Sequence, residues 1–162
     1  MKTSSAYEMP HKLILLAEDN DDDLALGIRA IKRCEGDYRV VTARDGADAL
    51  ELLGLGAVPN PEPLRPDLIL LDLKMPKMNG LEVLERIRAT HDYASTPVVM
   101  MTSSDEPNDI ALCFEAGANS YTVKPVDYTD FIEQLCTTIG YWTRINRTPA
   151  KQAEKSGNIG AA

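Results

Sequence analysis

The sequence lacks the features of membrane proteins, secreted proteins and zinc-binding modules. No apolar run in its 162 residues approaches the roughly 20 residues that a transmembrane helix requires. Residues 1–12 also lack the apolar stretch of a secretory signal. Only three cysteines occur, Cys34, Cys113 and Cys136, and they show neither CxxC spacing nor a histidine pattern for zinc. We therefore expect a cytoplasmic protein whose cysteines are reduced and lie in helices as small apolar residues.

Positive charge is also scarce. Lysine and arginine number 17 against 25 aspartates and glutamates, which gives a formal net charge of -8. Because contacts with phosphates supply most of the affinity for DNA and RNA, this balance argues against a nucleic-acid partner. The length favours one domain, which can bury a core without disulfides or a structural metal.

Five short apolar runs alternate with stretches in which apolar residues recur every three or four positions. This alternation predicts five parallel strands joined by helical, right-handed crossovers, which is the doubly wound α/β fold class. The first, third and fourth runs are almost continuously apolar, as strands covered on both faces should be. The runs are residues 13–17, 39–43, 68–71, 98–101 and 120–123.

Two segments stand outside this repeat. Residues 54–66 carry four prolines and two glycines, which predicts a long surface loop. Residues 147–162 are small and polar, and we expect them to be largely disordered. The predicted organisation is an N-terminal arm at 1–11, one domain at 12–146 and a tail at 147–162.

Groups of complementary charge follow four of the predicted strands. Glu18 and Asp19 follow the first, Asp72 the third, Thr102 the fourth and Lys124 the fifth. In a sheet of this class, ligands bind beyond the carboxyl ends of the strands. Three carboxylates brought together there repel one another unless a cation neutralises them, and oxygen ligands favour Mg2+. The pattern predicts a Mg2+ site with an ammonium and a hydroxyl placed for a phosphoryl group.

Each of these groups has a simpler explanation when it is taken alone. The acidic run at 18–23 also fits a solvated loop or a helix N-terminus. Asp72 and Thr102 are typical of turns and helix caps, and Lys124-Pro125 of a surface turn. The arrival of all of them at one edge of the sheet favours a functional site.

Four motifs, in this order, resemble the receiver domains of two-component response regulators, the CheY-like family. They are LILLAEDN at 13–20, LILLDLKMPKMNG at 68–80, VVMMTSS at 98–104 and GANSYTVKP at 117–125. The resemblance spans residues 12–140 and implies strand order 2-1-3-4-5. It implies a receiver that takes a phosphoryl group from a sensor histidine kinase and signals through protein contacts, without a DNA-binding output domain. No enzymatic activity beyond its own phosphorylation and dephosphorylation is implied.

The resemblance also implies a role for individual residues. Asp72 would be the phosphoacceptor. Four residues would hold Mg2+, the last through its backbone carbonyl: Glu18, Asp19, Asp72 and Lys74. Three would contact the phosphoryl group: Thr102, Ser103 and Lys124. Thr102 and Tyr121 would move inward on phosphorylation, and the peptide bond before Pro125 would be cis.

Two further features resemble receivers that partner phytochrome-type histidine kinases, which tend to dimerise. One is the long loop at 54–66, and the other is the aromatic pair Tyr141 and Trp142 at the end of the fifth helix. We expect a homodimer built on the fourth helix, fifth strand and fifth helix, with this pair at the interface. Alternatively, the pair packs back on the sheet.

Three other functions make different demands on the same positions. A haloacid-dehalogenase-like phosphatase needs a second aspartate at 74, where this chain has Lys74. A flavodoxin needs a glycine- and hydroxyl-rich loop after the first strand, where residues 18–20 read EDN. A phosphorylation-independent scaffold with a receiver fold would have lost Asp72 or Lys124, and both are present.

Overall fold

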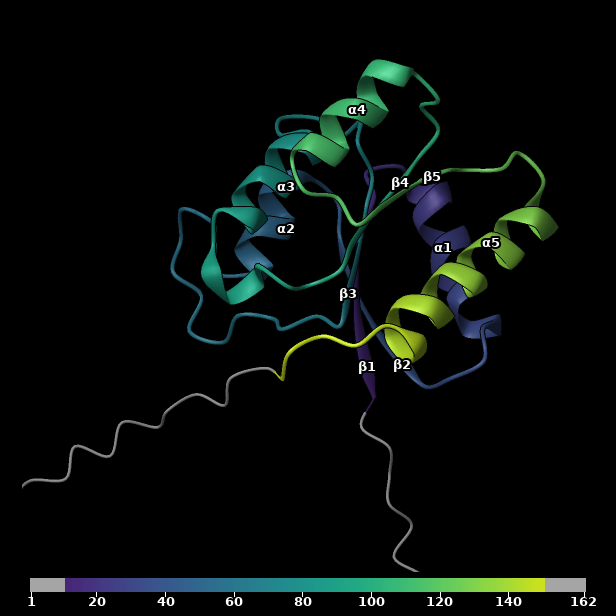
Figure 1. The fold of residues 1–162 in the computed structure, drawn as a ribbon, viewed down its shortest axis with the longest axis horizontal. Coiled ribbons are helices and arrows are strands. Elements are labelled where there is room, and N and C mark those ends of the chain that lie inside the picture. The colour runs from purple at the N-terminus through teal and green to yellow at the C-terminus, as the bar shows by residue number, and fades with distance from the viewer. Residues whose placement is uncertain (1–10, 151–162) are drawn as a thin grey trace, which may run out of the picture.

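The computed structural model describes residues 11–150 of the chain (Figure 1). The predicted arm, apart from His11, and the predicted tail beyond residue 150 lie outside the described residues, and residues 147–150 form neither helix nor strand. The elements in chain order are β1 (Lys12–Ala17), α1 (Asp21–Arg33), β2 (Tyr38–Ala43), α2 (Gly46–Leu52), β3 (Leu68–Leu71), α3 (Gly80–Arg88), the 3-10 turn η1 (His91–Tyr93), β4 (Val98–Thr102), α4 (Pro107–Glu115), β5 (Ser120–Val123), α5 (Tyr128–Gly140) and the π-helical turn η2 (Tyr141–Ile145).

The five strands form one parallel sheet in the expected order β2-β1-β3-β4-β5. Ala17 pairs with Leu71, which pairs in turn with Met100, so the carboxyl ends of the three central strands lie at one edge. Every residue of β3 and β4 is buried, which explains why these runs are continuously apolar. Each strand begins and ends within one residue of its predicted bounds.

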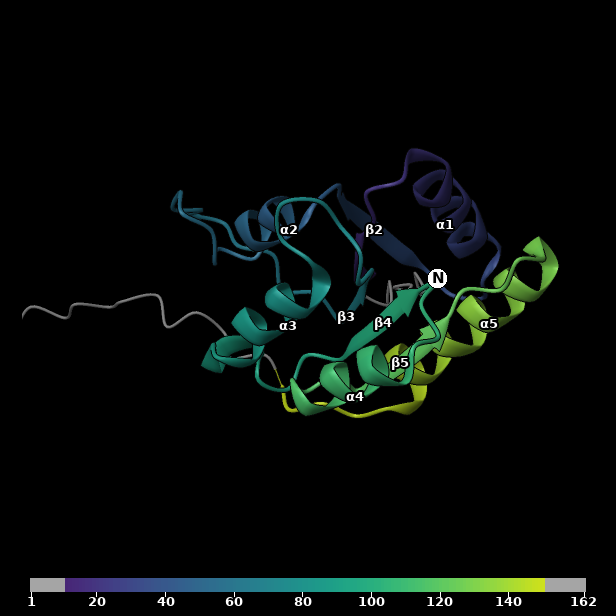
Figure 2. The same cartoon turned by 90° about the horizontal axis from the view of Figure 1, so that it is seen from above.

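Helices cover both faces of the sheet (Figures 1 and 2). Helices α1 and α5 lie on one face, and α2, α3 and α4 lie on the other. Successive strand residues point to opposite faces, so Leu15 and Leu71 join one core cluster while Leu16 and Leu70 join the other. Among residues 11–150, no helix combines the length and the apolar character needed to cross a bilayer.

The loop at 54–66 runs over the surface, as predicted, but it is anchored to the domain. The hydroxyl of Tyr93, which is 2% exposed, lies 2.6 Å from the carbonyl oxygen of Leu53 and 2.8 Å from that of Leu64, and the two oxygens share its single proton. The Leu64 amide also donates to the Leu52 carbonyl at 2.8 Å. One buried phenol therefore fixes both ends of a segment that the sequence marks only as proline-rich.

The end of α5 folds back on the domain through η2. The Thr143 hydroxyl donates to the Ile139 carbonyl at 2.7 Å and lies 3.3 Å from the hydroxyl of Tyr38 on β2. Trp142 is partly buried against the core cluster under α1 and α5, whereas Tyr141 is 46% exposed. Of the two aromatic residues predicted at a dimer interface, Trp142 thus packs on its own core and Tyr141 remains accessible.

The expectation that all three cysteines are reduced is wrong for this structure. Cys34 and Cys136 form a disulfide, with Cα atoms 5.0 Å apart. Cys34 is the C-cap of α1 and Cys136 lies on α5, and these two helices pack side by side on one face of the sheet. The two cysteines are 102 residues apart in the sequence, so the sequence pattern did not predict their contact. Cys113 is free and fully buried, as expected.

Tyr93→Phe should lower the stability of the protein by about 1–2 kcal/mol, because two carbonyl oxygens lose a buried donor. This loss corresponds to a fall in the melting temperature (Tm) of about 3–6 °C for a domain of this size. Thermal unfolding followed by circular dichroism measures it, with Tyr141→Phe as the matched control at an exposed ring. A Tm equal to that of the wild type would show that the loop is not anchored by this hydroxyl.

Candidate functional site

The groups predicted to converge do so at the carboxyl edge of the sheet. Strands β1, β3, β4 and β5 are neighbours in that order, so the residues at or just after their ends lie close together. The side chains brought together in this way are Glu18, Asp19, Asp72, Thr102 and Lys124.

Three carboxylates form the acidic part of the site. Carboxylate oxygens of Glu18, Asp19 and Asp72 lie within 4.8 Å of one another, with Glu18 and Asp72 buried and Asp19 exposed. The Lys74 amide donates to Asp72 at 3.4 Å. A Cβ atom at Gly80 would lie 2.1 Å from the Asp72 carbonyl oxygen, so the start of α3 can approach this backbone only with glycine there.

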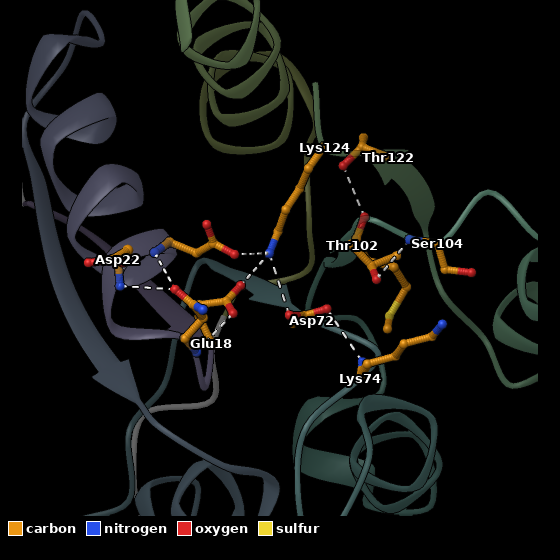
Figure 3. A network of polar contacts seen from close by, with 11 residues as sticks. Glu18, Asp22, Asp72, Lys74, Thr102, Ser104, Thr122 and Lys124 are labelled. Atoms are coloured by element: carbon orange, nitrogen blue, oxygen red, sulfur yellow. Dashed lines mark hydrogen bonds and ion pairs between the residues drawn. The ribbon is translucent and has the colours of Figure 1, made fainter. Parts of the chain in front are cut away.

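One ammonium lies between the two buried carboxylates. Figure 3 shows Lys124 reaching between Glu18 and Asp72. Its Nζ donates a hydrogen bond to Glu18 Oε2 and lies 3.4 Å from Asp72 Oδ2. Asp23 contributes a third acidic contact at 3.7 Å, which was not predicted because the acidic run was expected to supply only Glu18 and Asp19. With Asp19 also nearby, one positive charge faces a larger number of negative ones.

Burial controls the protonation of this cluster. Desolvation raises the pKa of Glu18 to about 7, and the Lys124 ammonium opposes this shift only in part. Burial lowers the pKa of Lys124, but the hydrogen bond to Glu18 and the charge of Asp72 outweigh it, and the pKa lies above its usual value. A cation beside Glu18 would favour its ionised form.

The residues present fit a hard divalent cation. All the acidic ligands are oxygens, and Asp19 and Lys74 line the same surface depression beside the cluster, as a carboxylate and a backbone carbonyl on one ion would require. Mg2+ usually takes only a few protein ligands and keeps several waters, which suits a site open on the Asp19 side.

The predicted hydroxyl groups lie in and after β4. Thr102 is fully buried, and its hydroxyl accepts a hydrogen bond from the Ser104 amide at 3.4 Å. Ser103 is exposed. Tyr121 donates to the Ser104 carbonyl at 2.8 Å, and Ser104 donates to Asp109 of α4 at 2.5 Å. Ser104 therefore joins the two predicted switch residues to α4, a role that the sequence did not indicate.

The peptide bond between Lys124 and Pro125 is trans, which corrects the expected cis form. No cis peptide bond occurs among residues 11–150. The trans isomer is intrinsically favoured before proline by about 0.5–1 kcal/mol. It already lets the Lys124 amide donate to the Thr102 carbonyl at 2.8 Å while the ammonium reaches Glu18. The expectation came from family resemblance alone.

Comparison with known proteins identifies this arrangement. Residues 14–136 match the family described as the response regulator receiver domain. The chain belongs to the response-regulator receiver family. This assignment agrees with the parallel sheet of order 2-1-3-4-5 and with the two-component phosphoacceptor function expected from the motifs.

The receiver resembles several response regulators over most of their length, and among them RcpA and RtBRR are phytochrome response regulators by name. Response regulator Rcp1 of Synechocystis is 33% identical over 141 residues, which cover 87% of this chain and 95% of Rcp1. The structure of the Mn2+-bound form of Rcp1 aligns with a TM-score of 0.77 at 32% identity, over 86% of this chain and 99% of that one. The phosphorylated cyanobacterial phytochrome response regulator RcpA aligns with a TM-score of 0.79 at 32% identity, over 87% and 100% of the two chains. The bacteriophytochrome response regulator RtBRR aligns at 0.67 and 39% identity, over 88% and 84%.

Mg2+ should raise the Tm of the receiver, since a ligand that binds only the folded state stabilises it by RT ln(1 + [L]/Kd). Asp19→Asn should weaken this shift more than Glu18→Gln, because Asp19 is expected to contact the ion directly. Asp22→Asn, an exposed carboxylate of the same acidic run, is the matched control. Differential scanning fluorimetry over a Mg2+ series measures the effect. A wild-type Tm independent of Mg2+ would contradict the site.

Without metal, Glu18→Gln should raise the Tm by about 2–4 °C at about pH 8. The pKa of Glu18 is raised from 4.5 to about 7 in the folded protein, so the stability it contributes is full below 4.5 and is lost as the pH rises through 7. The Tm advantage of the variant should accordingly disappear in acid. An equal advantage at all pH values would show that burial of the charged form is not its cause.

Proposed function

We propose that this receiver accepts a phosphoryl group on Asp72 from a sensor histidine kinase in a Mg2+-dependent reaction. The observation that carries the proposal is the position of Lys124, whose ammonium lies 3.4 Å from Asp72 within a cluster of three carboxylates. The two carboxylate oxygens of Asp72 make only long hydrogen bonds, at 3.4 Å from the Lys74 amide and 3.4 Å from the Lys124 ammonium, and they lie beside the other two carboxylates.

The transfer would need little covalent chemistry from the protein. A carboxylate oxygen of Asp72 attacks phosphorus in line, and the P–N bond of the phosphohistidine breaks with its electron pair returning to the imidazole. Lys124 shifts from Asp72 to an equatorial oxygen of the transferring group and neutralises its charge. When bound, Mg2+ supplies further positive charge to the same oxygens. Glu18, Asp19, Asp72 and the Lys74 carbonyl are the residues that would hold it.

The phosphorylated state would be read through Thr102 and Tyr121. An acyl phosphate at Asp72 adds a charge of about -1.5 to -2 and new acceptor oxygens. The Thr102 hydroxyl would turn toward these oxygens and lose its hydrogen bond from the Ser104 amide. Tyr121 donates to the Ser104 carbonyl, so the change would shift the conformational equilibrium of the face made by α4, β5 and α5. Ser103 and Lys124 would complete the contacts with the phosphoryl group.

The kinase partner we propose is a phytochrome-type histidine kinase in the cytoplasm. Support comes from the relatives, since RcpA and RtBRR, which are phytochrome response regulators by name, resemble this receiver over most of their length. The activity would be confined to the receiver's own phosphorylation and dephosphorylation, with output through protein contacts. The alternative, a scaffold that needs no phosphate, predicts that loss of Asp72 has no effect on partner binding.

Asp72→Asn should abolish labelling by acetyl phosphate and by the cognate kinase, because the amide cannot form the acyl phosphate. The wild type should carry a label that is sensitive to acid and to hydroxylamine. Among the histidine kinases of the source genome, a phytochrome-type kinase should transfer the phosphoryl group fastest. Asp22→Asn again serves as the control, since it keeps the charge change but lies outside the carboxylate cluster. Full labelling of Asp72→Asn would overturn the assignment.

We further propose a homodimer on the face of α4, β5 and α5. Phe114 of α4 is 50% exposed, and Tyr141 is 46% exposed at the end of α5. Exposed aromatic side chains are typical of interfaces. Trp142 supports the surface from below, packed against the core.

Tyr141→Ala should therefore lower the dimer fraction in sedimentation velocity without lowering the Tm, whereas Trp142→Ala should destabilise the monomer through the cavity it leaves. Tyr141→Phe is the control that keeps the ring. Unchanged sedimentation of Tyr141→Ala would remove this residue from the interface. A wild-type monomer both free and with beryllofluoride would exclude the dimer and leave the phosphoacceptor proposal intact.

A further inference from the structure

A covalent bond joins the end of α1 to the second half of α5, and a polar contact joins the start of β2 to the turn η2 that follows α5. Cys34, the C-cap of α1, is bonded to Cys136 of α5. Nearby, the hydroxyl of Tyr38, the first residue of β2, lies 3.3 Å from that of Thr143. Helix α5 is thus fixed to α1 at one defined place, on the face of the sheet that Figure 2 shows covered by these two helices alone.

We propose that Cys34 and Cys136 form a reversible dithiol–disulfide redox site that fastens α5 to α1. The proposal goes beyond the phosphoacceptor function and does not depend on it. The redox partner would be a small thiol and its disulfide, such as reduced and oxidised glutathione, or a dithiol protein of similar chemistry.

The two cysteine residues differ in exposure, and we expect the exchange to begin at the more exposed residue. Cys34 is 8% exposed, while Cys136 is only partly buried. An external thiolate therefore attacks Cys136 Sγ, the S–S bond breaks, and Cys34 leaves as a thiolate that takes up a proton. A second external thiol then attacks the mixed disulfide, which releases Cys136 as a thiol and the reagent as its own disulfide. Oxidation is the reverse, with the small disulfide accepting the two electrons.

The surroundings accommodate the reduced state as well as the oxidised one. Cys34 Sγ lies 3.3 Å from the carbonyl oxygen of Ala30, so as a thiol it has a hydrogen-bond acceptor in place. The core cluster around it is built from many other apolar residues of α1, α5 and the strands, which we expect to stay packed without the bond. Reduction should therefore loosen α5 without unfolding the domain.

The remaining cysteine cannot interfere with this pair. Cys113 is fully buried and belongs to the core cluster on the opposite face of the sheet. The redox site also lies away from the phosphoryl site: Cys34 precedes β2, whose first residue Tyr38 pairs with Lys12 at the start of β1, whereas Asp72 follows the end of β3. Its redox state should affect α5 and leave the chemistry at Asp72 unchanged.

Counting thiols tests the bond directly. After equilibration with oxidised glutathione, alkylation under denaturing conditions followed by mass spectrometry should modify Cys113 alone. After treatment of the native protein with excess dithiothreitol, it should modify all three cysteines. Three free thiols in the oxidised sample would overturn the disulfide. Resistance of the native protein to dithiothreitol would overturn its reversibility.

The mechanical consequence is tested on the wild type in both states. Reduction should lower the Tm by about 10 °C, since the bond closes a long loop, and the Cys34→Ser/Cys136→Ser variant should show no redox-dependent shift. Hydrogen exchange should become faster in the second half of α5 and stay unchanged in β3. Cys113→Ala should keep the full redox effect. Equal Tm and equal exchange in the two states would refute the fastening, and a change in the rate of labelling by acetyl phosphate would refute its separation from the phosphoryl site.

Discussion

The site depends on one interaction, the ammonium of Lys124 held between the buried carboxylates of Glu18 and Asp72. Removing such charges from water costs several kcal/mol for each ion, and a single lysine offsets only part of that cost. The raised pKa of Glu18 expresses the same imbalance. Any added positive charge therefore stabilises the cluster. In the phosphoryl transfer that we propose, a divalent cation and the lysine together neutralise the negatively charged oxygens.

The fold holds these like charges together by backbone means. Four neighbouring parallel strands end at one edge, and their order places each group independently of the helices between them. Local contacts then refine the positions. The Asn20 amide donates to Glu18 at 3.2 Å, and the Asn20 side chain caps α1, so that the helix starts directly after the acidic pair. Gly80 has no side chain, so the start of α3 can lie directly against the backbone carbonyl of Asp72. The polar side chains lie at the ends of the buried strands or directly after them, and the strands fix their spacing.

Periodicity predicted the strands closely because burial on both faces forces a continuous apolar run, as in residues 68–71, and the strand-end rule then placed Asp72 and Lys124 correctly. What escaped the sequence are contacts between segments far apart in it. Nothing in the sequence relates Cys34 to Cys136, and Trp142 reads equally as an interface or a core residue until α5 is seen against α1. Asp23 was indistinguishable from its acidic neighbours, although the first turn of α1 aims it toward Lys124. The trans bond at Pro125 shows the limit of resemblance as evidence.

The two edges of the sheet thus carry different features. The predicted phosphoryl site lies where the strands end, and the disulfide that joins α5 to α1 lies where β1 and β2 begin.

The central claim is that Asp72 itself carries the phosphoryl group. The most direct measurement is borohydride reduction of the labelled protein followed by peptide mass spectrometry, since the reagent converts an aspartyl phosphate to homoserine. The account predicts homoserine at position 72 and only in samples labelled with Mg2+ present. Homoserine at position 19, or an acid-stable phosphate on Thr102 or Ser103, would contradict it.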